Sequence, residues 1–240
     1  MRQVFQDAET EKKFLQDGFV VLPGFIPAEA CEHLTAVFNQ LNTGFDKGFH
    51  VTNWSKDYNY KQTSHEEVCK LLLPAAQNIS VNYKPVLGCY AVKYPGEGSE
   101  MGIHQDWSLC DESVAHSFSV WCPLQDVEVS NGAMQFYRGS HNIYSAIRGK
   151  DIPFQWKPEQ QYIEENLLET LPVKAGDAVL LHHRIVHRSL PNLSGRPRLA
   201  AMLAMIPQEQ SVKQFFMKDN HITVLNQPDD FYVHYDIGLY

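Results

Sequence analysis

From about residue 80 onward, the chain is a series of short β-rich runs separated by clusters of turn-forming residues. The runs are VLGCYAVKY, HSFSVWCPLQDV, GAMQFY, LETLPV, DAVLLHHRIVHRS and RLAAMLAMI, and the clusters include PGEG, SNG, KAGD and PNLSG. Many short strands of this kind are typical of a sandwich, a barrel or a jelly roll around one core. A chain of 240 residues is long enough for one such domain.

The first 80 or so residues have a different pattern, which is mainly helical with one inserted strand. TEKKFLQDG has a candidate N-cap at Thr10 and a stop at Gly18. FVVLPGF follows as a strand, and PAEACEHLTAVFNQLN repeats apolar residues at helical spacing. SHEEVCKLLLPAAQNI opens with Ser64 and Glu67 in capping-box register, which predicts the start of a helix. We therefore expect one domain over 1–240, with a helical flank (1–80), a β core (81–210) and a C-terminal segment (211–240).

The composition argues against several classes of protein. A formal net charge of -8 is opposite to the basic surface that a nucleic-acid-binding domain needs. The five cysteines include no CxxC pair, which indicates reduced thiols in the cytoplasm and not a disulfide framework. No apolar stretch approaches the roughly 18 residues of a membrane span. We expect a cytoplasmic protein that acts on a small molecule, with neither a nucleic-acid nor a membrane partner.

The stretch GIHQDW (102–107) places two good metal ligands, His104 and Asp106, two residues apart. Successive side chains of a strand point to opposite faces, so these two would share one face while Gln105 points away. A surface pair before a turn is the alternative interpretation. Two ligands cannot hold a catalytic metal alone, so a third is needed from elsewhere in the chain.

Several downstream histidines are candidates for the third ligand. His182 and His183 are adjacent, so at most one of them faces inward. His187 lies near the end of the run AVLLHHRIVHRS, far enough from Asp106 in the sequence for the intervening chain to fold back. The remaining candidates are His116, His141, His221 and His234.

The order of these motifs resembles that of the phytanoyl-CoA dioxygenase family of iron(II)- and 2-oxoglutarate-dependent oxygenases. That family combines a His-x-Asp pair with a distant histidine on a late strand and an arginine eleven residues beyond it. Here the late motif is HRSLPNLSGRPR, from His187 to Arg198. FLQDGFVVLPGFIPAEACEHL, SNGAMQFYRGSH and VKAGDAVLLHHRIVH match further family elements, so the resemblance covers nearly the whole chain.

The resemblance implies a double-stranded β-helix core (a cupin-like jelly roll) with flanking helices. It also implies that His104, Asp106 and His187 form the facial triad of a non-haem iron(II) site, which leaves positions for 2-oxoglutarate and dioxygen. Arg198 would bind the far carboxylate of 2-oxoglutarate, because a guanidinium donates two parallel hydrogen bonds to a carboxylate. Arg196 is the rival residue, and the family spacing favours Arg198.

Further residues are assigned to the site by the same resemblance. Ser189 and Trp121 would lie beside the co-substrate, although Trp121 fits a plain core position equally well. Tyr90 and Lys93 would contact the co-substrate or the substrate, and Gln105 would contact the substrate. We expect Trp107, Asp111 and Glu112 to be packing or solvated loop residues. The long irregular segment 142–168, which contains Arg148, is expected to form a lid over the pocket.

The predicted activity is hydroxylation of an unactivated C–H bond of a small organic metabolite, with release of succinate and carbon dioxide. Halogenating relatives lack the carboxylate of the His-x-Asp pair, whereas Asp106 is present here. Desaturation or cyclisation in natural-product biosynthesis is an alternative outcome of the same chemistry. A cupin-like metalloenzyme that does not use 2-oxoglutarate and a non-catalytic cupin-like binding protein are two further alternatives. For the substrate, we favour a small polar molecule or a natural product over a CoA thioester.

Overall fold

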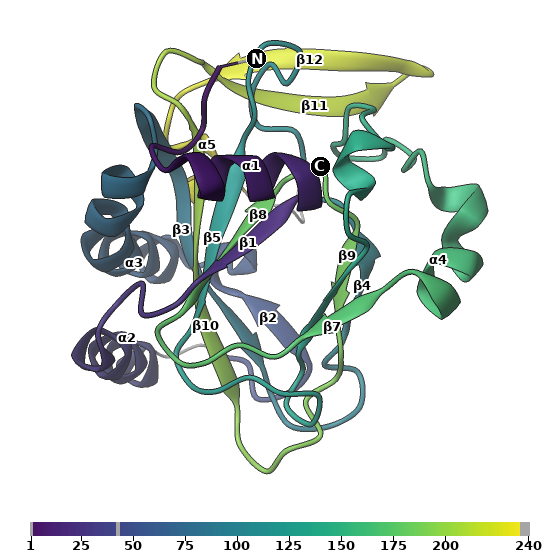
Figure 1. Ribbon diagram of the computed structural model, residues 1–240. Helices are drawn as coiled ribbons and strands as arrows, with labels where there is room; N and C mark the ends of the chain where they lie inside the picture. The colour runs from purple at the N-terminus through teal and green to yellow at the C-terminus, as the bar shows by residue number, and fades with distance from the viewer. Residues whose placement is uncertain (1, 42–43, 236–240) are drawn as a thin grey trace.

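The computed structural model describes residues 2–41 and 44–235, and its strands form two facing antiparallel sheets and a separate hairpin (Figure 1). The main sheet has the order β1 (Phe19–Leu22), β8 (Ala178–His182), β5 (Phe118–Pro123), β10 (Arg198–Pro207), β3 (Tyr83–Lys93) and β2 (Phe49–Val51). The minor sheet has the order β4 (Met101–His104), β9 (His187–Ser189), β6 (Met134–Phe136) and β7 (Glu169–Leu171). The hairpin consists of β11 (Val212–Lys218) and β12 (His221–Gln227). This arrangement is the jelly roll that the sequence predicts.

The two faces of the main sheet bury two different cores. On β5, Phe118 and Val120 belong to the core under the helices, whereas Trp121 belongs to the core between the sheets. On β10, Leu199 packs under the helices and Ala200 faces the minor sheet. This alternation follows from the two-residue period of a strand. Both faces are covered, which explains why these runs are almost continuously apolar.

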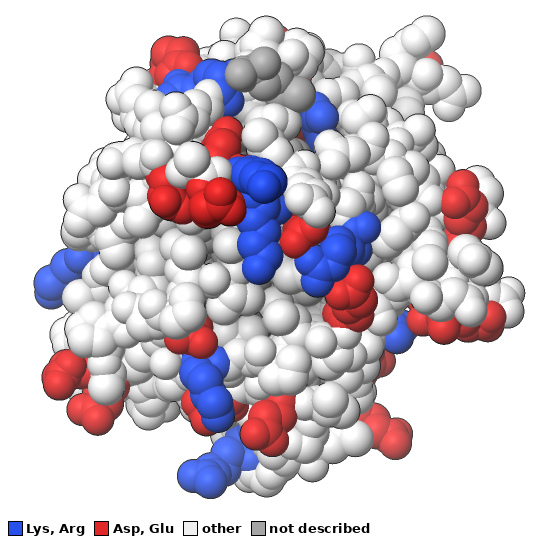
Figure 2. Space-filling view, in the orientation of Figure 1, with Lys and Arg blue, Asp and Glu red and all other residues white. Residues whose placement is uncertain are grey.

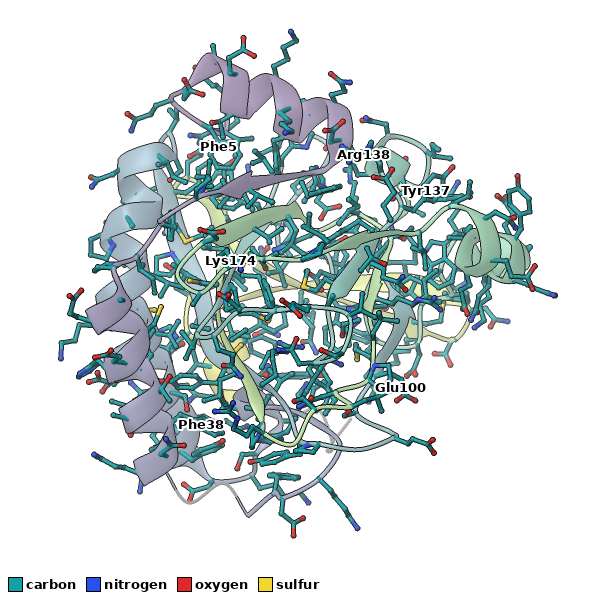
Figure 3. All side chains as sticks on the ribbon, turned by 60° about the horizontal axis from the view of Figure 1, so that its bottom comes forward. Phe5, Phe38, Glu100, Tyr137, Arg138 and Lys174 are labelled. Carbon is teal, nitrogen blue, oxygen red and sulfur yellow. The ribbon has the colours of Figure 1, made fainter. Side chains whose placement is uncertain are left out.

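Three helices cover the outer face of the main sheet: α1 (Ala8–Asp17), α2 (Ala28–Gln40) and α3 (Tyr58–Ile79) (Figure 1). Phe5 and Phe38 lie on this helical side (Figure 3) and are buried in its core. The predicted stop at Gly18 is correct, because Gly18 adopts a φ of 82° at the C-cap of α1. The N-cap of α1 is Asp7 and not Thr10, whose backbone N–H donates to the Asp7 carboxylate.

Two further local predictions are wrong. The third helix begins at Tyr58, where Asp57 accepts a hydrogen bond from the Tyr60 N–H. Ser64 therefore lies inside the helix, and its hydroxyl donates to the Tyr60 carbonyl instead of capping. The late run AVLLHHRIVHRS is two strands, because the chain leaves the main sheet after His182 and enters the minor sheet at His187.

The connecting segments carry the remaining elements. The segment 142–168 contains local structure, with the 3₁₀ turn η3 (Lys157–Glu159) and the helix α4 (Gln160–Asn166). Two further 3₁₀ turns are η1 (Thr52–Trp54) and η2 (Ser140–Asn142), and α5 (Phe231–His234) follows the hairpin. Strands β1 and β2 lie within the first 80 residues, but they join the main sheet. The division of the chain into a helical flank, a β core and a C-terminal segment stays a prediction. Residues 236–240 of its C-terminal segment lie outside the described residues.

Charged side chains of both signs are interspersed over the face shown in Figure 2, without a basic stripe. Arg138, labelled in Figure 3, is one of the exposed cations. It joins two parts of the fold by bonding to Asp17 at the end of α1 and to Glu169 on β7. Among the described residues, no helix combines the length and the apolar character that crossing a membrane requires.

Candidate active site

The structure brings His104, Asp106 and His187 together inside the jelly roll. His104 ends β4 and His187 begins β9, and the two residues are direct partners in the antiparallel ladder. Asp106 follows two residues after the end of β4. One ligand atom from each residue can be chosen so that all three atoms lie within 4.8 Å of one another. Such a spacing fits one metal ion bound by two imidazoles and a carboxylate.

Backbone carbonyls orient both imidazoles. Nδ1 of His104 lies 2.8 Å from the Gly102 carbonyl, and Nδ1 of His187 lies 3.0 Å from the Ile185 carbonyl. A carbonyl can only accept, so each Nδ1 carries the proton and each Nε2 is left with a free lone pair for a metal. The Phe136 ring stacks on His187 with its centroid 5.8 Å away, which further restricts the rotation of that imidazole.

The electrostatics of the triad keep the ligands in their metal-binding forms. Burial lowers the pKa of His104 to about 4, and the neighbouring His187 adds to this effect, so the imidazole is neutral at pH 7. Burial acts to raise the pKa of Asp106, but the charges of His187, His183 and His104 outweigh it and hold that pKa below its usual value. Asp106 is therefore a carboxylate and His104 a neutral imidazole over the same broad pH range.

A cavity of about 480 Å³ contains the three residues, and its lining extends to Arg198, Ser189 and Trp121. Arg198 is only 2% exposed, and its Nε and Nη1 groups have no hydrogen-bond partner among the described residues. Its Nη2 donates weakly to the Gly132 carbonyl at 3.4 Å, and its guanidinium lies 5.4 Å from the Trp121 ring centre. Burial lowers the pKa of Arg198 to about 9, which leaves it charged at neutral pH.

Buried polar groups without partners are costly, so a cation in this state fits a site that an anion completes. A carboxylate group would satisfy both unpartnered donors of Arg198 at once. The rival residue, Arg196, is exposed and does not line the cavity. Ser189 and Trp121 line the same cavity, and their contacts with the co-substrate stay predictions.

Lys93 lies next to Arg198, because the two residues are direct partners on β3 and β10. Its ammonium donates to the Ser99 carbonyl and lies 4.8 Å from the Phe49 ring centre, and Lys93 is not part of the cavity lining. Burial and the charge of Arg198 lower the pKa of Lys93 to about 7. The stem of Lys93 requires Gly132 in the turn SNG, because a Cβ there would lie 2.6 Å from the Lys93 Cδ. Because Lys93 does not line the cavity, it would act on the co-substrate through its charge and not through a direct contact.

The structure contradicts the predicted contact of Tyr90, whereas the predicted substrate contact of Gln105 stays a prediction. Tyr90 points to the opposite face of the main sheet, where its hydroxyl donates to the Leu34 carbonyl under the helices. Gln105 borders the cavity, but its Nε2 donates to two backbone carbonyls and its Oε1 accepts from the Trp156 Nε1. Both ends of its carboxamide are thus occupied, and Gln105 fixes the segment 142–168 against the metal-ligand loop.

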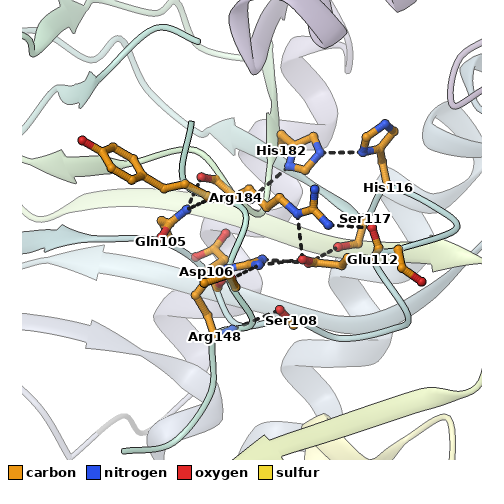
Figure 4. Close-up of polar contacts among 12 residues, drawn as sticks. Gln105, Asp106, Ser108, Glu112, His116, Ser117, Arg148, His182 and Arg184 are labelled. Carbon is orange, nitrogen blue, oxygen red and sulfur yellow. Dashed lines mark hydrogen bonds and ion pairs between the residues drawn. The ribbon is translucent and has the colours of Figure 1, made fainter. Parts of the chain in front are cut away.

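Sequence reasoning missed a buried ion network beside Asp106 (Figure 4). Glu112, expected to be solvated, is 1% exposed and accepts two hydrogen bonds from Arg148 at 2.6 and 2.7 Å. Arg184 donates a further hydrogen bond to Glu112 at 3.0 Å. The Nε of Arg148 also donates to the backbone carbonyl of Asp106 at 3.0 Å. Arg148 therefore braces the metal-ligand loop and is not a free cation in a lid.

The segment 142–168 is packed against the minor sheet through a small core of its own. Tyr144, Trp156 and Ile163 are buried there together with Val186. Phe154 reaches the cavity and forms part of its wall. The segment therefore borders the pocket as the sequence suggests, while the ordering of this segment on substrate binding stays a prediction. Trp107, expected to be a packing residue, also lines the cavity.

Comparisons with known proteins agree with this geometry. Residues 14–200 match the family described as Phytanoyl-CoA dioxygenase (PhyH). The rat Phytanoyl-CoA dioxygenase domain-containing protein 1 is 25% identical, over 79% of this chain and 86% of that protein. Among the solved structures that share the fold are SnoN and HygX. The 2-oxoglutarate-dependent epimerase SnoN from nogalamycin biosynthesis has a TM-score of 0.60 and 19% identity, over 86% of this chain and 85% of its own.

The other structure is HygX from Streptomyces hygroscopicus, solved with nickel and 2-oxoglutarate bound. It has a TM-score of 0.61 and 18% identity, over 85% of this chain and 88% of its own. SnoN has also been solved in complex with Fe³⁺, alpha ketoglutarate and nogalamycin RO. The match to the family extends from the first helix, through all three metal-ligand candidates, to the arginine and the strand that it begins. The chain therefore belongs to the phytanoyl-CoA dioxygenase (PhyH) family of iron- and 2-oxoglutarate-dependent oxygenases.

Proposed function

We propose that this protein uses iron(II), 2-oxoglutarate and dioxygen to hydroxylate an unactivated C–H bond of a small organic metabolite. The observation that carries the proposal is the pairing of two features in one cavity. One is the cluster of His104, Asp106 and His187, and the other is Arg198 with two unpartnered donors. A metal site alone would suit many enzymes. The buried guanidinium of Arg198 in the same cavity suits a small molecule that binds the metal at one end and carries a carboxylate at the other.

Each residue has a defined part in this scheme. His104, Asp106 and His187 would hold iron(II) through two Nε2 atoms and a carboxylate oxygen, with the Nδ1 protons fixed on backbone carbonyls. Arg198 would orient 2-oxoglutarate through its far carboxylate, and Ser189 and Trp121 would flank it. The bound metal, co-substrate and dioxygen would supply the oxidation, in which R–H, 2-oxoglutarate and O₂ give R–OH, succinate and carbon dioxide.

The presence of Asp106 favours hydroxylation over halogenation, because its carboxylate would fill the metal position that a halide would need. Desaturation and cyclisation use the same residues and differ in how the substrate is placed. The solved neighbours include an epimerase and a carbocyclase, so the fold accommodates several outcomes. A metalloenzyme that does not use 2-oxoglutarate would have no use for the unpartnered donors of Arg198. A non-catalytic binding protein would have no need for the complete ligand set.

The reaction is tested by product analysis. Purified protein is supplied with iron(II), 2-oxoglutarate, chloride and ¹⁸O-labelled dioxygen, and candidate substrates are scored by substrate-stimulated succinate release. Mass spectrometry of the product should then show one added labelled oxygen atom, with exchange into water controlled. A chlorinated or dehydrogenated product would contradict hydroxylation.

The metal assignment has its own test. His187→Ala should abolish the weak visible band that forms when iron(II) and 2-oxoglutarate are added without oxygen. His183→Ala should keep the band, because the Nε2 of His183 is engaged with the Ser119 hydroxyl at 2.9 Å. An unchanged band in His187→Ala would remove this residue from the ligand set.

A further inference from the structure

The cavity continues past the metal ligands into a second region that 2-oxoglutarate would leave empty. Strand β10 forms one wall and contributes Arg198, Met202 and Ala204 to the lining. Ala204 lies six positions after Arg198, which corresponds to about 20 Å of extended chain. Met202 lies between them, and its ladder partner Cys89 lines the cavity as well. The cavity that contains the metal ligands therefore extends along β10 well beyond Arg198.

The region at the Ala204 end has an almost wholly apolar wall. We call it the distal chamber and define it by the six residues Leu87, Trp107, Leu109, Ala204, Tyr232 and Tyr235. The indole of Trp107 and the ring of Tyr235 meet edge to face at 6.2 Å, as do the rings of Tyr232 and Tyr235 at 6.1 Å. The Tyr232 hydroxyl already donates to the Lys213 carbonyl. The chamber thus presents aliphatic groups and ring surfaces.

Charge is absent from this part of the lining. In the described part of the chain, the whole cavity is lined by one arginine, Arg198, one carboxylate, Asp106, and no lysine. The proposed function uses both charged groups, one for the co-substrate and one for the metal. A charged substrate group in the distal chamber would lose its hydration without gaining an ion-pair partner, which is strongly unfavourable.

An uncharged polar group lies near the apolar wall, where α5, which carries Tyr232, contacts η1. Asn53, in η1, lines the cavity, and its buried Oδ1 has no hydrogen-bond partner among the described residues. A hydroxyl or N–H group on a ligand would satisfy this acceptor. The Nδ1 of His183 also lacks a partner, but His183 lies close enough to Asp106 to respond to its charge and belongs to the surroundings of the metal.

From these observations we infer that the distal chamber binds an uncharged, largely apolar substrate with a ring system and one hydroxyl or N–H group that donates to Asn53. The inference rests on the proposed function for the position of 2-oxoglutarate. It disfavours amino acids, osmolytes and CoA thioesters, and of the two substrate classes expected from the sequence it favours a natural product over a small polar molecule. Ring contacts with Trp107 and Tyr235 would orient the substrate, and the single polar contact would set its register.

The test compares three probes that share one ring system and differ in charge. They are 2-naphthalenemethanol, 2-naphthoate and the trimethyl(2-naphthylmethyl)ammonium ion. Each is titrated calorimetrically into protein loaded with nickel(II) and 2-oxoglutarate, so that Arg198 is occupied and no turnover occurs. The alcohol should bind at least tenfold more tightly than either ion. Equal or tighter binding of 2-naphthoate, or of the ammonium ion through the aromatic rings, would overturn the inference.

Variants of the wall locate the probe. Ala204→Phe should fill the chamber and weaken binding of the alcohol at least tenfold, while 2-oxoglutarate binding stays unchanged. Leu87→Phe provides a second obstruction at a half-buried position if Ala204→Phe does not fold. Asn53→Ala should weaken the alcohol about tenfold, on the scale of one hydrogen bond to a buried acceptor, and should leave naphthalene unaffected. Asn39→Ala, at an exposed position of α2, is the matched control. Unchanged binding of the alcohol in the obstructed variants would place it elsewhere.

The results separate this inference from the proposed function. Loss of metal and 2-oxoglutarate binding with intact binding of the alcohol would contradict the proposed function and support the chamber. Normal formation of the iron(II)–2-oxoglutarate band, with no preference for the uncharged probe, would contradict the chamber and leave the proposed function standing.

Discussion

Two buried arginines flank the metal ligands and differ in how their guanidinium groups are satisfied. Arg148 is 1% exposed and Arg198 is 2% exposed. The guanidinium of Arg148 donates to both carboxylate oxygens of Glu112 and to the backbone carbonyls of Asp106 and Ala146. Arg198 makes one long hydrogen bond, and two of its nitrogens have no partner among the described residues.

The difference separates a structural charge from a binding charge. Glu112 and Arg148 neutralise each other, and the bonds from Arg148 hold the pKa of Glu112 below its usual value although burial acts to raise it. This pair fixes the loop that carries Asp106. Arg198 has no such counterion among the described residues, so the rest of the fold must hold its charged side chain in the buried position. Burial alone would not distinguish the two arginines, whereas their unpartnered donors do.

The largest expected effect is on stability, and a matched pair of substitutions measures it. Arg148→Met should lower the free energy of unfolding by about 3–5 kcal/mol, because removing one partner of a buried ion pair leaves Glu112 incompletely neutralised. Arg198→Met should leave the free energy of unfolding unchanged or raise it, because it removes an unpaired buried charge and keeps an apolar stem. Chemical denaturation of the metal-free proteins tests both.

Glu97→Ala, in an exposed turn, gives the baseline for removing a surface charge. Equal losses of stability in Arg148→Met and Arg198→Met would mean that both arginines are structural, and the distinction between them would fail.

The next largest effect should appear in co-substrate binding and should reverse the ranking of the two arginines. Arg198→Met deletes a charge-assisted, two-pronged contact, so 2-oxoglutarate should bind about 2–4 kcal/mol more weakly. Calorimetric titration of 2-oxoglutarate into the nickel(II)-loaded protein measures this directly. Arg196→Met should bind 2-oxoglutarate normally, since Arg196 is exposed. A larger effect in Arg196→Met would move the carboxylate site away from Arg198.

The two arginines also show what the sequence could and could not predict. The family pattern predicts Arg198 from its position eleven residues after His187, and strand periodicity predicts that His104 and Asp106 lie on one side of Gln105. In the structure the strand ends at His104 and Asp106 follows it, although both residues line the cavity. Neither signal exists for Arg148 and Glu112, which are 36 residues apart and meet only in three dimensions. Two charged residues in irregular segments look the same in a sequence whether they are paired or solvated.

The errors in local structure have a similar origin. Ser64 and Glu67 have capping-box spacing, but Asp57 offers an earlier cap, and packing of Tyr60 and Val68 favours the longer helix. The run from Ala178 to Ser189 hides a change of sheet, because the residues of β8 and most of those of β9 are buried. Tyr90 has the residue type expected of a site, but its position in the two-residue alternation puts it under the helices.

Acidification should lower the free energy of unfolding through His116, which lies near the ion network of Arg148 and Arg184. The Nδ1 of His116 lies 2.8 Å from the Nε2 of His182 (Figure 4). Burial, followed by the charge of the nearby Arg184, lowers the pKa of His116 to about 4. His141 also lowers this pKa, and Glu112 opposes the shift. The unfolded chain binds a proton below about pH 6.5 that the folded chain refuses. Stability is therefore full above pH 6.5 and falls towards pH 4, by about 2 kcal/mol at pH 5 for this group.

Denaturation curves between pH 7 and pH 5 test this expectation. His116→Asn should show a shallower loss of stability than the unaltered protein, and His221→Asn, at an exposed position, should follow the unaltered protein. An identical pH dependence in His116→Asn would show that other groups control the stability in acid. It would also show that the ion network of Glu112, Arg148 and Arg184 tolerates an added charge.

The smallest expected effect concerns the Arg198 side and comes from Lys93. Burial and the charge of Arg198 lower the pKa of Lys93 to about 7, below the ordinary value of a lysine. An anionic co-substrate at Arg198 favours the protonated form of Lys93, so binding should be strongest below pH 7. Affinity should then fall as the pH rises through 7 and Lys93 loses its charge, by several-fold between pH 6.5 and 8.5, on the order of 1 kcal/mol. Lys93→Met should bind 2-oxoglutarate more weakly at pH 6.5 and show no such step.

His104 cannot supply the step, because its pKa of about 4 lies far below this range. If Lys93→Met kept the same slope, the pH dependence would come from another group, and the charge at this end of the cavity would belong to Arg198 alone.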